Sequence, residues 1–155
     1  MSDTGSSLPM PSAEPQPAHV VLEVGTGSGY QSAVLARIVR HVYSVEIIES
    51  LGLMADRRLK QLEFTNISVH IGDGYEGWTI HGPFDGIMVT CGAETVPPTL
   101  IEQLKPGGRM IIPVGPYFDM QTLLLVEKDS VGHVTSNEKM PVRFVPMTGG
   151  HEIRS

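Results

Sequence analysis

The chain has 155 residues, of which 41% are hydrophobic and 18% charged, the proportions of a single globular domain. Acidic residues outnumber basic ones by 17 to 11, and the longest basic cluster is Arg57-Arg58, which argues against nucleic-acid binding. The single cysteine, Cys91, cannot form an internal disulfide, and no apolar run is long enough to span a membrane, so we expect a soluble protein of the reducing cytoplasm.

The beginning of the chain differs in composition from the rest. Residues 1–18 are rich in Ser, Pro and Gly and almost lack large apolar side chains, which predicts a flexible tail. We expect one folded domain over residues 19–150 and a short C-terminal tail over residues 151–155.

Strands and helices alternate along the predicted domain. Short apolar runs rich in β-branched residues predict buried strands, and apolar positions three or four residues apart predict helices. The predicted strands are residues 20–24, 42–45, 67–71, 84–89 and 110–114. The predicted helices have apolar faces made by Tyr30, Val34, Leu35 and Ile38, by Ile48, Leu51, Ala55, Leu59 and Leu62, and by Leu100, Ile101 and Leu104.

The last third of the chain changes character. Residues 122–127 and 134–145 are strand-like, and the turn-rich run 128–132 separates them, which predicts an antiparallel hairpin. Alternating strands and helices followed by a hairpin predict a doubly wound α/β sheet, mostly parallel, with an antiparallel C-terminal edge.

A glycine-rich segment joins the first predicted strand to the first predicted helix and reads LEVGTGSGYQ from Leu22 to Gln31. Glycines let the backbone approach a ligand closely, and the following helix N-terminus presents free N–H groups. Tyr30 stands where the dinucleotide fingerprint has its third glycine. The Glu23 carboxylate would repel a pyrophosphate but attract the ammonium and sulfonium groups of S-adenosylmethionine, which we therefore expect as the cofactor. For an isolated glycine pattern, a simple connecting turn is the alternative.

Two further acids lie where the second and third predicted strands end. Glu46 is placed to accept hydrogen bonds from ribose hydroxyls, and Asp73, between two glycines, can face an adenine amino group. Taken singly, Glu46 is also explained as a solvated helix-capping acid and Asp73 as an ordinary turn residue. The joint placement of three acids at the carboxyl ends of successive strands favours a cofactor site.

Several segments resemble protein-L-isoaspartate O-methyltransferases over about residues 20 to 148. They are Leu22 to Gln31, Ile71-Gly72-Asp73-Gly74-Tyr75-Glu76-Gly77-Trp78, Pro83-Phe84-Asp85-Gly86-Ile87, Gln103-Leu104-Lys105-Pro106-Gly107-Gly108-Arg109 and Arg143-Phe144-Val145-Pro146. The resemblance implies a Rossmann-like methyltransferase fold. It also implies methyl transfer from S-adenosylmethionine to the free carboxylate of isoaspartyl residues in damaged proteins, which starts their repair.

The resemblance also implies roles for individual residues. The implied cofactor-binding residues are Glu23, Gly25, Thr26, Gly27, Gly29, Glu46, Asp73 and Gly74. Thr90 would lie near the transferred methyl group, and Arg143, Phe144 and Val145 would contact the substrate peptide. An edge-strand position in solvent is the alternative for Arg143, and rim packing for Phe144. Cys91 is interpreted as a buried small hydrophobe, and the histidine spacing predicts no metal site.

Members of the family carry an N-terminal segment that covers the cofactor, and nothing in residues 1–18 matches it. We therefore expect a more exposed cofactor and an uncovered apolar sheet face that promotes self-association. Two alternatives to an isoaspartyl methyltransferase stay open. One is a non-catalytic S-adenosylmethionine-binding module that needs a partner segment, and the other is a related methyltransferase with another acceptor.

Overall fold

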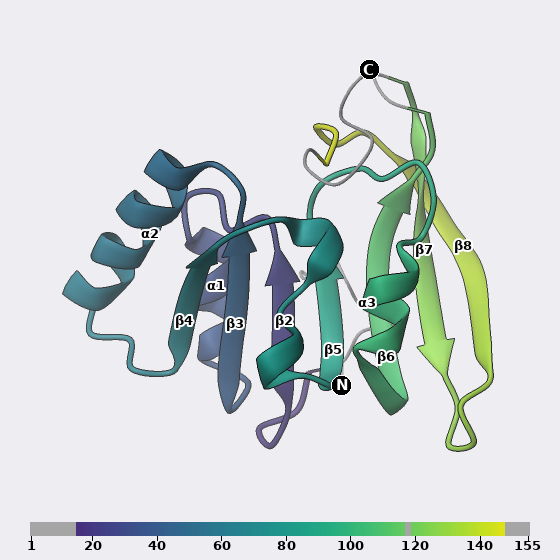
Figure 1. Cartoon of the computed structure of the whole chain (residues 1–155), viewed down its shortest axis with the longest axis horizontal. Coiled ribbons are helices and arrows are strands. Elements are labelled where there is room, and N and C mark those ends of the chain that lie inside the picture. Colours follow the sequence, from purple (N-terminus) through teal and green to yellow (C-terminus); the bar gives the residue numbers. More distant parts are fainter. Residues whose placement is uncertain (1–14, 117–118, 148–155) are drawn as a thin grey trace.

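The computed structural model describes residues 15–116 and 119–147, and within them one seven-stranded sheet has the order β4-β3-β2-β5-β6-β7-β8 (Figure 1). The strands are β2 (Val20–Val24), β3 (His41–Glu46), β4 (Ile67–Ile71), β5 (Phe84–Val89), β6 (Leu104–Val114), β7 (Gln121–Lys128) and β8 (Val134–Val142). The helices are α1 (Tyr30–Ala36), α2 (Glu49–Gln61) and α3 (Pro98–Glu102), with the short 3-10 helices η1 (Gly74–Glu76) and η2 (Thr79–His81). The predicted tails fall largely in residues 1–14 and 148–155, outside the described part.

The strand pairing confirms the predicted doubly wound sheet. From β4 to β6 all neighbouring strands are parallel, and β7 pairs antiparallel with both β6 and β8. The chain builds outward from β2 through β3 to β4, then crosses back to place β5 on the other side of β2. The strand order therefore reverses at β2, and in open α/β sheets such a reversal leaves a crevice at the carboxyl ends of the two strands concerned, here β2 and β5.

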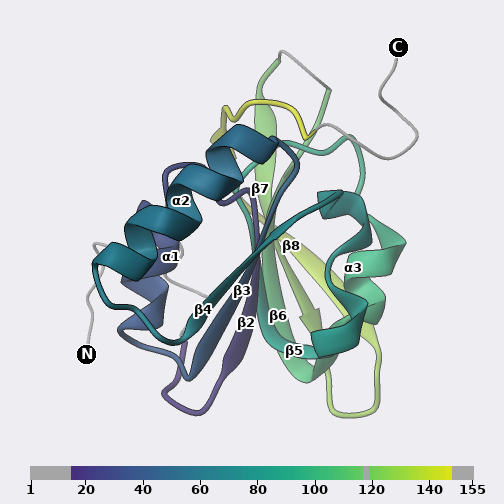
Figure 2. The same ribbon diagram turned by 60° about the vertical axis from the view of Figure 1, so that its left-hand side comes forward.

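Helices cover both faces of the sheet. Figure 2 shows α1 and α2 on one face and α3 on the other. Neighbouring residues of a strand point to opposite faces, so Val21 packs with Leu35 of α1 while Leu22 packs with Leu100 of α3. This two-sided burial explains why β2 is apolar along most of its length. In the described residues no helix is long and apolar enough to cross a membrane.

The prediction for the third helix was wrong at its C-terminal end. Helix α3 ends at Glu102, and Leu104 is the first residue of β6, where its side chain is buried. Leu104 reaches the core from a strand as well as it would from a helix, so spacing alone did not separate the two. Pro106 disfavours helical geometry at Lys105, so the chain cannot continue as a helix beyond Leu104. Tyr30 begins α1 but is 74% exposed, so it does not belong to that helix's buried face.

Asn66 holds the end of α1 against the strands. Its side-chain Nδ2 donates to the carbonyl oxygens of Ala36 at 2.8 Å, Val39 at 3.3 Å and Arg40 at 3.4 Å. The last carbonyls of a helix have no hydrogen-bond partner within the helix. Here one side-chain amide donates to carbonyl oxygens at the end of α1 and in the turn that leads into β3.

We predict that Asn66→Asp lowers the free energy of unfolding by about 1 to 3 kcal/mol, because a carboxylate oxygen would face carbonyl oxygens that now receive N–H groups. Asn137→Asp is the matched control, since Asn137 is exposed on β8 and the change adds the same charge. Urea unfolding of the three proteins measures the difference. Equal stability of the two variants would contradict this role for Asn66.

Candidate functional site

A pocket of about 220 Å³ lies at the carboxyl ends of the central parallel strands. It is lined by Val24, Gly25, Gly27, Val45, Glu46, Ile47, Ile48, Leu51, Gly74, Thr90, Cys91, Val145, Pro146 and Met147. Four of the eight predicted cofactor residues are in this lining, namely Gly25, Gly27, Glu46 and Gly74. The pocket thus occupies the crevice at which the strand order reverses, where open α/β sheets bind ligands.

The turn after β2 needs its glycines. Gly25, Gly27 and Gly29 have φ values of 101°, 54° and 90°, which side chains rarely adopt. At Gly25 there is also no room, because a Cβ would lie 2.5 Å from Thr90 Oγ1. The turn therefore presents bare backbone to the pocket at Gly25 and Gly27, while Gly29 caps α1 next to Leu59 of α2.

Glu46 connects the ends of two strands and lines the pocket. Its Oε1 accepts a hydrogen bond from Gly27 N at 2.8 Å, and its Oε2 accepts one from Ile48 N at 3.2 Å. The residue is only 7% exposed, so little water competes for the carboxylate. A carboxylate has about four acceptor positions, and the two remaining ones are available to a ligand in the pocket.

The structure places Glu23 behind the glycine turn rather than on the pocket lining. Its side chain is fully buried, and Oε1 accepts hydrogen bonds from Ser32 of α1 and from Ser44 of β3, the latter at 2.6 Å. Thr26 joins this network through its hydroxyl, 2.6 Å from the Ser44 hydroxyl, and is itself buried. Glu23 Oε2 is buried and has no hydrogen-bond partner. Glu23 and Thr26 thus hold the turn in place from inside the protein.

Both Asp73 and Gly74 were predicted to bind the cofactor, but only Gly74 lines the pocket. Asp73 Oδ1 accepts a hydrogen bond from Tyr75 N at 2.9 Å and caps η1. Gly74 lines the pocket, and a Cβ there would lie 2.5 Å from Val24 Cγ1. Asp73 therefore sets the course of the backbone, and Gly74 lets the backbone pass close to β2.

Thr90 and Cys91 follow β5 at the back of the pocket. The Thr90 hydroxyl lies 3.0 Å from Gly25 O and 3.1 Å from Val24 O, and it donates to these carbonyls. Burial raises the pKa of the Cys91 thiol to about 12, and the negative charge of Glu46 adds to this effect. The thiol is therefore neutral near pH 7, as expected of a small hydrophobe rather than a nucleophile.

The segment after β8 reaches the pocket only in part. Val145 lines it, whereas Arg143 and Phe144 do not. Sequence reasoning missed the apolar lining made by Ile47, Ile48, Leu51, Pro146 and Met147. The sequence did hold one signal, because two large apolar residues, Ile47 and Ile48, directly follow Glu46 at the end of a predicted strand. In the structure they are 38% and 50% exposed, as residues that line a pocket can be.

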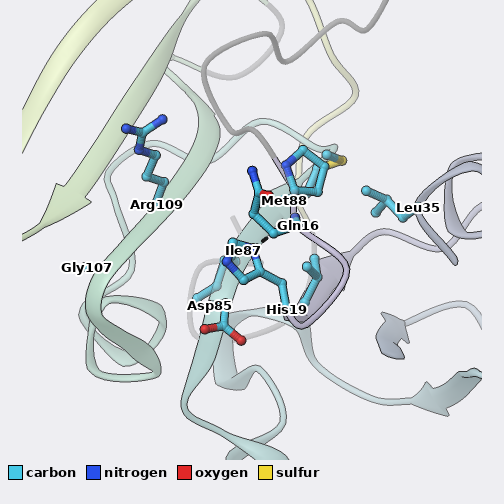
Figure 3. A pocket seen from close by; sticks show the side chains of 11 residues that line it. Gln16, His19, Leu35, Asp85, Ile87, Met88, Gly107 and Arg109 are labelled. Carbon is cyan, nitrogen blue, oxygen red and sulfur yellow. Dashed lines mark hydrogen bonds between the residues drawn. The ribbon is translucent and has the colours of Figure 1, made fainter. Parts of the chain in front are cut away.

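A second pocket, of about 240 Å³, lies near the amino ends of β2 and β5 on the α1 face (Figure 3). The charged side chains in its lining, Asp85 and Arg109, already have partners within the protein. Asp85 Oδ2 accepts a hydrogen bond from Val20 N at 2.8 Å and pairs with Lys105 at 3.4 Å, while Arg109 pairs with Glu127 at 3.2 Å. Its acid, Asp85, lies at the amino end of β5 and already has partners, whereas Glu46 lies at a carboxyl end beside the glycine turn, so the pocket at the carboxyl ends is the better candidate site.

Because Glu23 is buried, the stability of the folded protein should depend on pH. Burial raises the pKa of Glu23 from 4.5 to about 7, although the hydrogen bonds from Ser32 and Ser44 oppose the shift. Between these two values the folded protein keeps the proton and the unfolded chain releases it, so stability falls as pH rises and levels off above the folded pKa.

We predict that the unfolding free energy of the wild type, relative to that of Glu23→Gln, falls by about 3 kcal/mol between about pH 4.5 and about pH 7.5. The glutamine keeps the shape of the protonated acid and does not titrate, so taking the difference cancels all other groups. Urea unfolding across this range is the measurement. A difference that stays constant with pH would show that Glu23 is ionised in the folded protein.

Known proteins match this chain over most of its length. The family model described as Protein-L-isoaspartate(D-aspartate) O-methyltransferase matches residues 13–152. A relative from Syntrophobacter fumaroxidans, named Protein-L-isoaspartate O-methyltransferase 2, is 61% identical over 131 residues, which are 84% of this chain and 53% of that relative. The chain thus spans about half the length of this relative.

Solved structures show the same likeness. One named protein-L-isoaspartate O-methyltransferase has a TM-score of 0.84 at 34% identity, covering 90% of this chain and 45% of that one. A structure from Plasmodium falciparum in complex with S-adenosyl-L-homocysteine has a TM-score of 0.73 at 22% identity, over 86% of this chain and 67% of that one, which shows the fold alone. With a family model that covers nearly the whole chain, this protein belongs to the protein-L-isoaspartate O-methyltransferase family.

Proposed function

We propose that the strand-end pocket binds S-adenosylmethionine and that the protein transfers its methyl group to the free carboxylate of L-isoaspartyl residues in damaged proteins. The observation that carries the proposal is Glu46, a nearly buried carboxylate that faces the pocket beside the glycine turn of Gly25 and Gly27. Its partners are thus the cofactor and isoaspartyl peptides or proteins.

The pocket suits the chemistry of this cofactor. S-adenosylmethionine carries an ammonium and a sulfonium group, and the negative charge of Glu46 in a site with little water favours a cation. The ribose hydroxyls are donors for the free acceptor positions of Glu46. Apolar side chains from Ile48 and Leu51 offer a surface for the adenine ring, and the close backbone at Gly27 and Gly74 leaves space for the ligand.

The proposed reaction needs no strong general acid or base from the protein. A carboxylate acceptor is already ionised at neutral pH, and the bound cofactor supplies an activated methyl group. The chain must hold the two at about 3 to 3.5 Å in a site that excludes water. The Thr90 hydroxyl donates to the backbone of the glycine turn, so it fixes the floor of the site and does not act as a base.

Mass spectrometry of an isoaspartyl peptide, with its aspartyl isomer as the control, tests the proposed activity after incubation with the protein and S-adenosylmethionine. We expect a mass gain of one methyl group confined to the isoaspartyl peptide. If the folded protein binds the cofactor but modifies neither peptide, a cofactor-binding module or a methyltransferase with another acceptor replaces the proposal.

We predict that Glu46→Gln weakens the binding of S-adenosylmethionine by about tenfold or more, because hydrogen bonds to a charged acceptor contribute about 1.5 to 3 kcal/mol. The glutamine oxygen still accepts from Gly27 N, so the contact to the turn is kept, whereas its NH2 group would face Ile48 N and the hydrogen bond there is lost. Glu49→Gln on α2 loses the same charge outside the pocket lining and serves as the control. Isothermal titration calorimetry measures both. Equal affinities of the two variants would contradict the role of Glu46.

A further inference from the structure

Gln121, the first residue of β7, uses its buried side-chain amide to hold one residue of the segment after β8. The side chain is 1% exposed, its Oε1 accepts a hydrogen bond from Phe144 N at 2.9 Å, and its Nε2 donates to Phe144 O at 3.4 Å. The amide thus meets both polar groups of the Phe144 backbone, as a neighbouring strand would. Few side chains can do this, since both a donor and an acceptor are needed.

The residues after Phe144 are tied to the run that follows β5. Gly92 N donates to Val145 O at 2.8 Å, and Met147 N donates to Gly92 O at 2.7 Å, so Gly92 and Pro146 form a parallel bridge. Gly92 lies directly against the glutamine, because a Cβ there would be 2.8 Å from Gln121 Cδ and Nε2. Gln121 and Gly92 therefore hold the segment from Phe144 to Met147 in one position.

This segment is a wall of the strand-end pocket. Val145, Pro146 and Met147 all line it. Met147 is buried beside Gly74, whereas Val145 is 72% exposed and has little packing of its own. The position of Val145 thus depends on the backbone hydrogen bonds on either side of it.

We propose that Gln121 is a positioning residue for cofactor binding, which holds the Val145–Met147 wall in the conformation that the ligand contacts. The inference rests on the proposed function of the pocket. Gln121 does not line the pocket, so it acts through the wall.

The test compares Gln121→Glu and Gln121→Met with the wild type, using calorimetric binding of S-adenosylhomocysteine at about pH 5.5 and about pH 8. A buried glutamic acid has a raised pKa, so the variant is protonated at the lower pH, where its O–H replaces the missing donor, and ionised at the higher pH. We expect Gln121→Glu to bind about tenfold more weakly than the wild type at about pH 8 and within about threefold of it at about pH 5.5. Gln121→Met should be weaker at both.

The wild type at each pH controls for the other titratable groups near the pocket, Glu23, Glu46 and Cys91, which all proteins share. Gln61→Glu, at the exposed end of α2, controls for the added charge and should match the wild type. Circular dichroism confirms that each variant is folded.

The outcomes separate the inference from the proposed function. If the wild type does not bind S-adenosylhomocysteine, the proposed function fails. If the wild type binds and Gln121→Glu is either unchanged at both values of pH or equally weakened at both, the positioning role is wrong. Should neither variant fold, hydrogen exchange of the wild type decides: a protected Phe144 amide is expected, and rapid exchange would overturn the inference.

Discussion

Glu46 Oε1 accepts a hydrogen bond from Gly27 N at 2.8 Å, and this contact joins the ends of β2 and β3 across the glycine turn. Gly25, Gly27 and Gly29 have no side chains to hold the turn, so its shape depends on the buried Thr26 hydroxyl and on what its backbone contacts. Thr90 contacts it from the end of β5, and Glu46 from the end of β3. The pocket between β2, β3 and β5 exists because these three strand ends are held together.

The acids at the strand ends have different environments and therefore different roles. Glu23 points to the α1 face, where burial favours its neutral form, and it supports the turn through Ser32 and Ser44. Glu46 faces the pocket and keeps acceptor positions for a ligand. Asp73 caps η1 and sets the path of Gly74. Acidic side chains thus support the turn, line the pocket and set the course of the backbone, according to what surrounds each of them.

Local patterns in the sequence predicted most of the fold. The strands at 20–24, 67–71 and 84–89 have the predicted bounds, because apolar runs between glycines and turns are strong local signals. The error at Leu104 arose because helical spacing and a strand start look alike over a few residues. Glu23 was assigned to the cofactor from its charge and from the family resemblance; the structure directs its side chain to Ser32 and Ser44 and leaves it off the pocket lining, so its contact with the cofactor stays a prediction.

The parts of the site that the sequence did not predict depend on contacts between distant residues. Gln121 meets Phe144, 23 residues later, and Gly92 meets Val145. No local spacing relates these positions, and a glutamine at the start of a strand carries no motif. The family resemblance pointed to the segment at 143–145, but only the folded structure shows that Val145 lines the pocket while Arg143 does not. Self-association through an uncovered sheet face stays a prediction.

Amide chemical shifts of the isotope-labelled protein, recorded by NMR during titration with S-adenosylhomocysteine, test most directly where the cofactor binds. The account predicts that the largest shifts fall on Gly27, Gly74 and Val145 at the carboxyl ends of the strands, with His19 and Gly86 near the other pocket unchanged. Shifts that centre on His19 and Gly86, or the absence of saturable shifts in the folded protein, would contradict it.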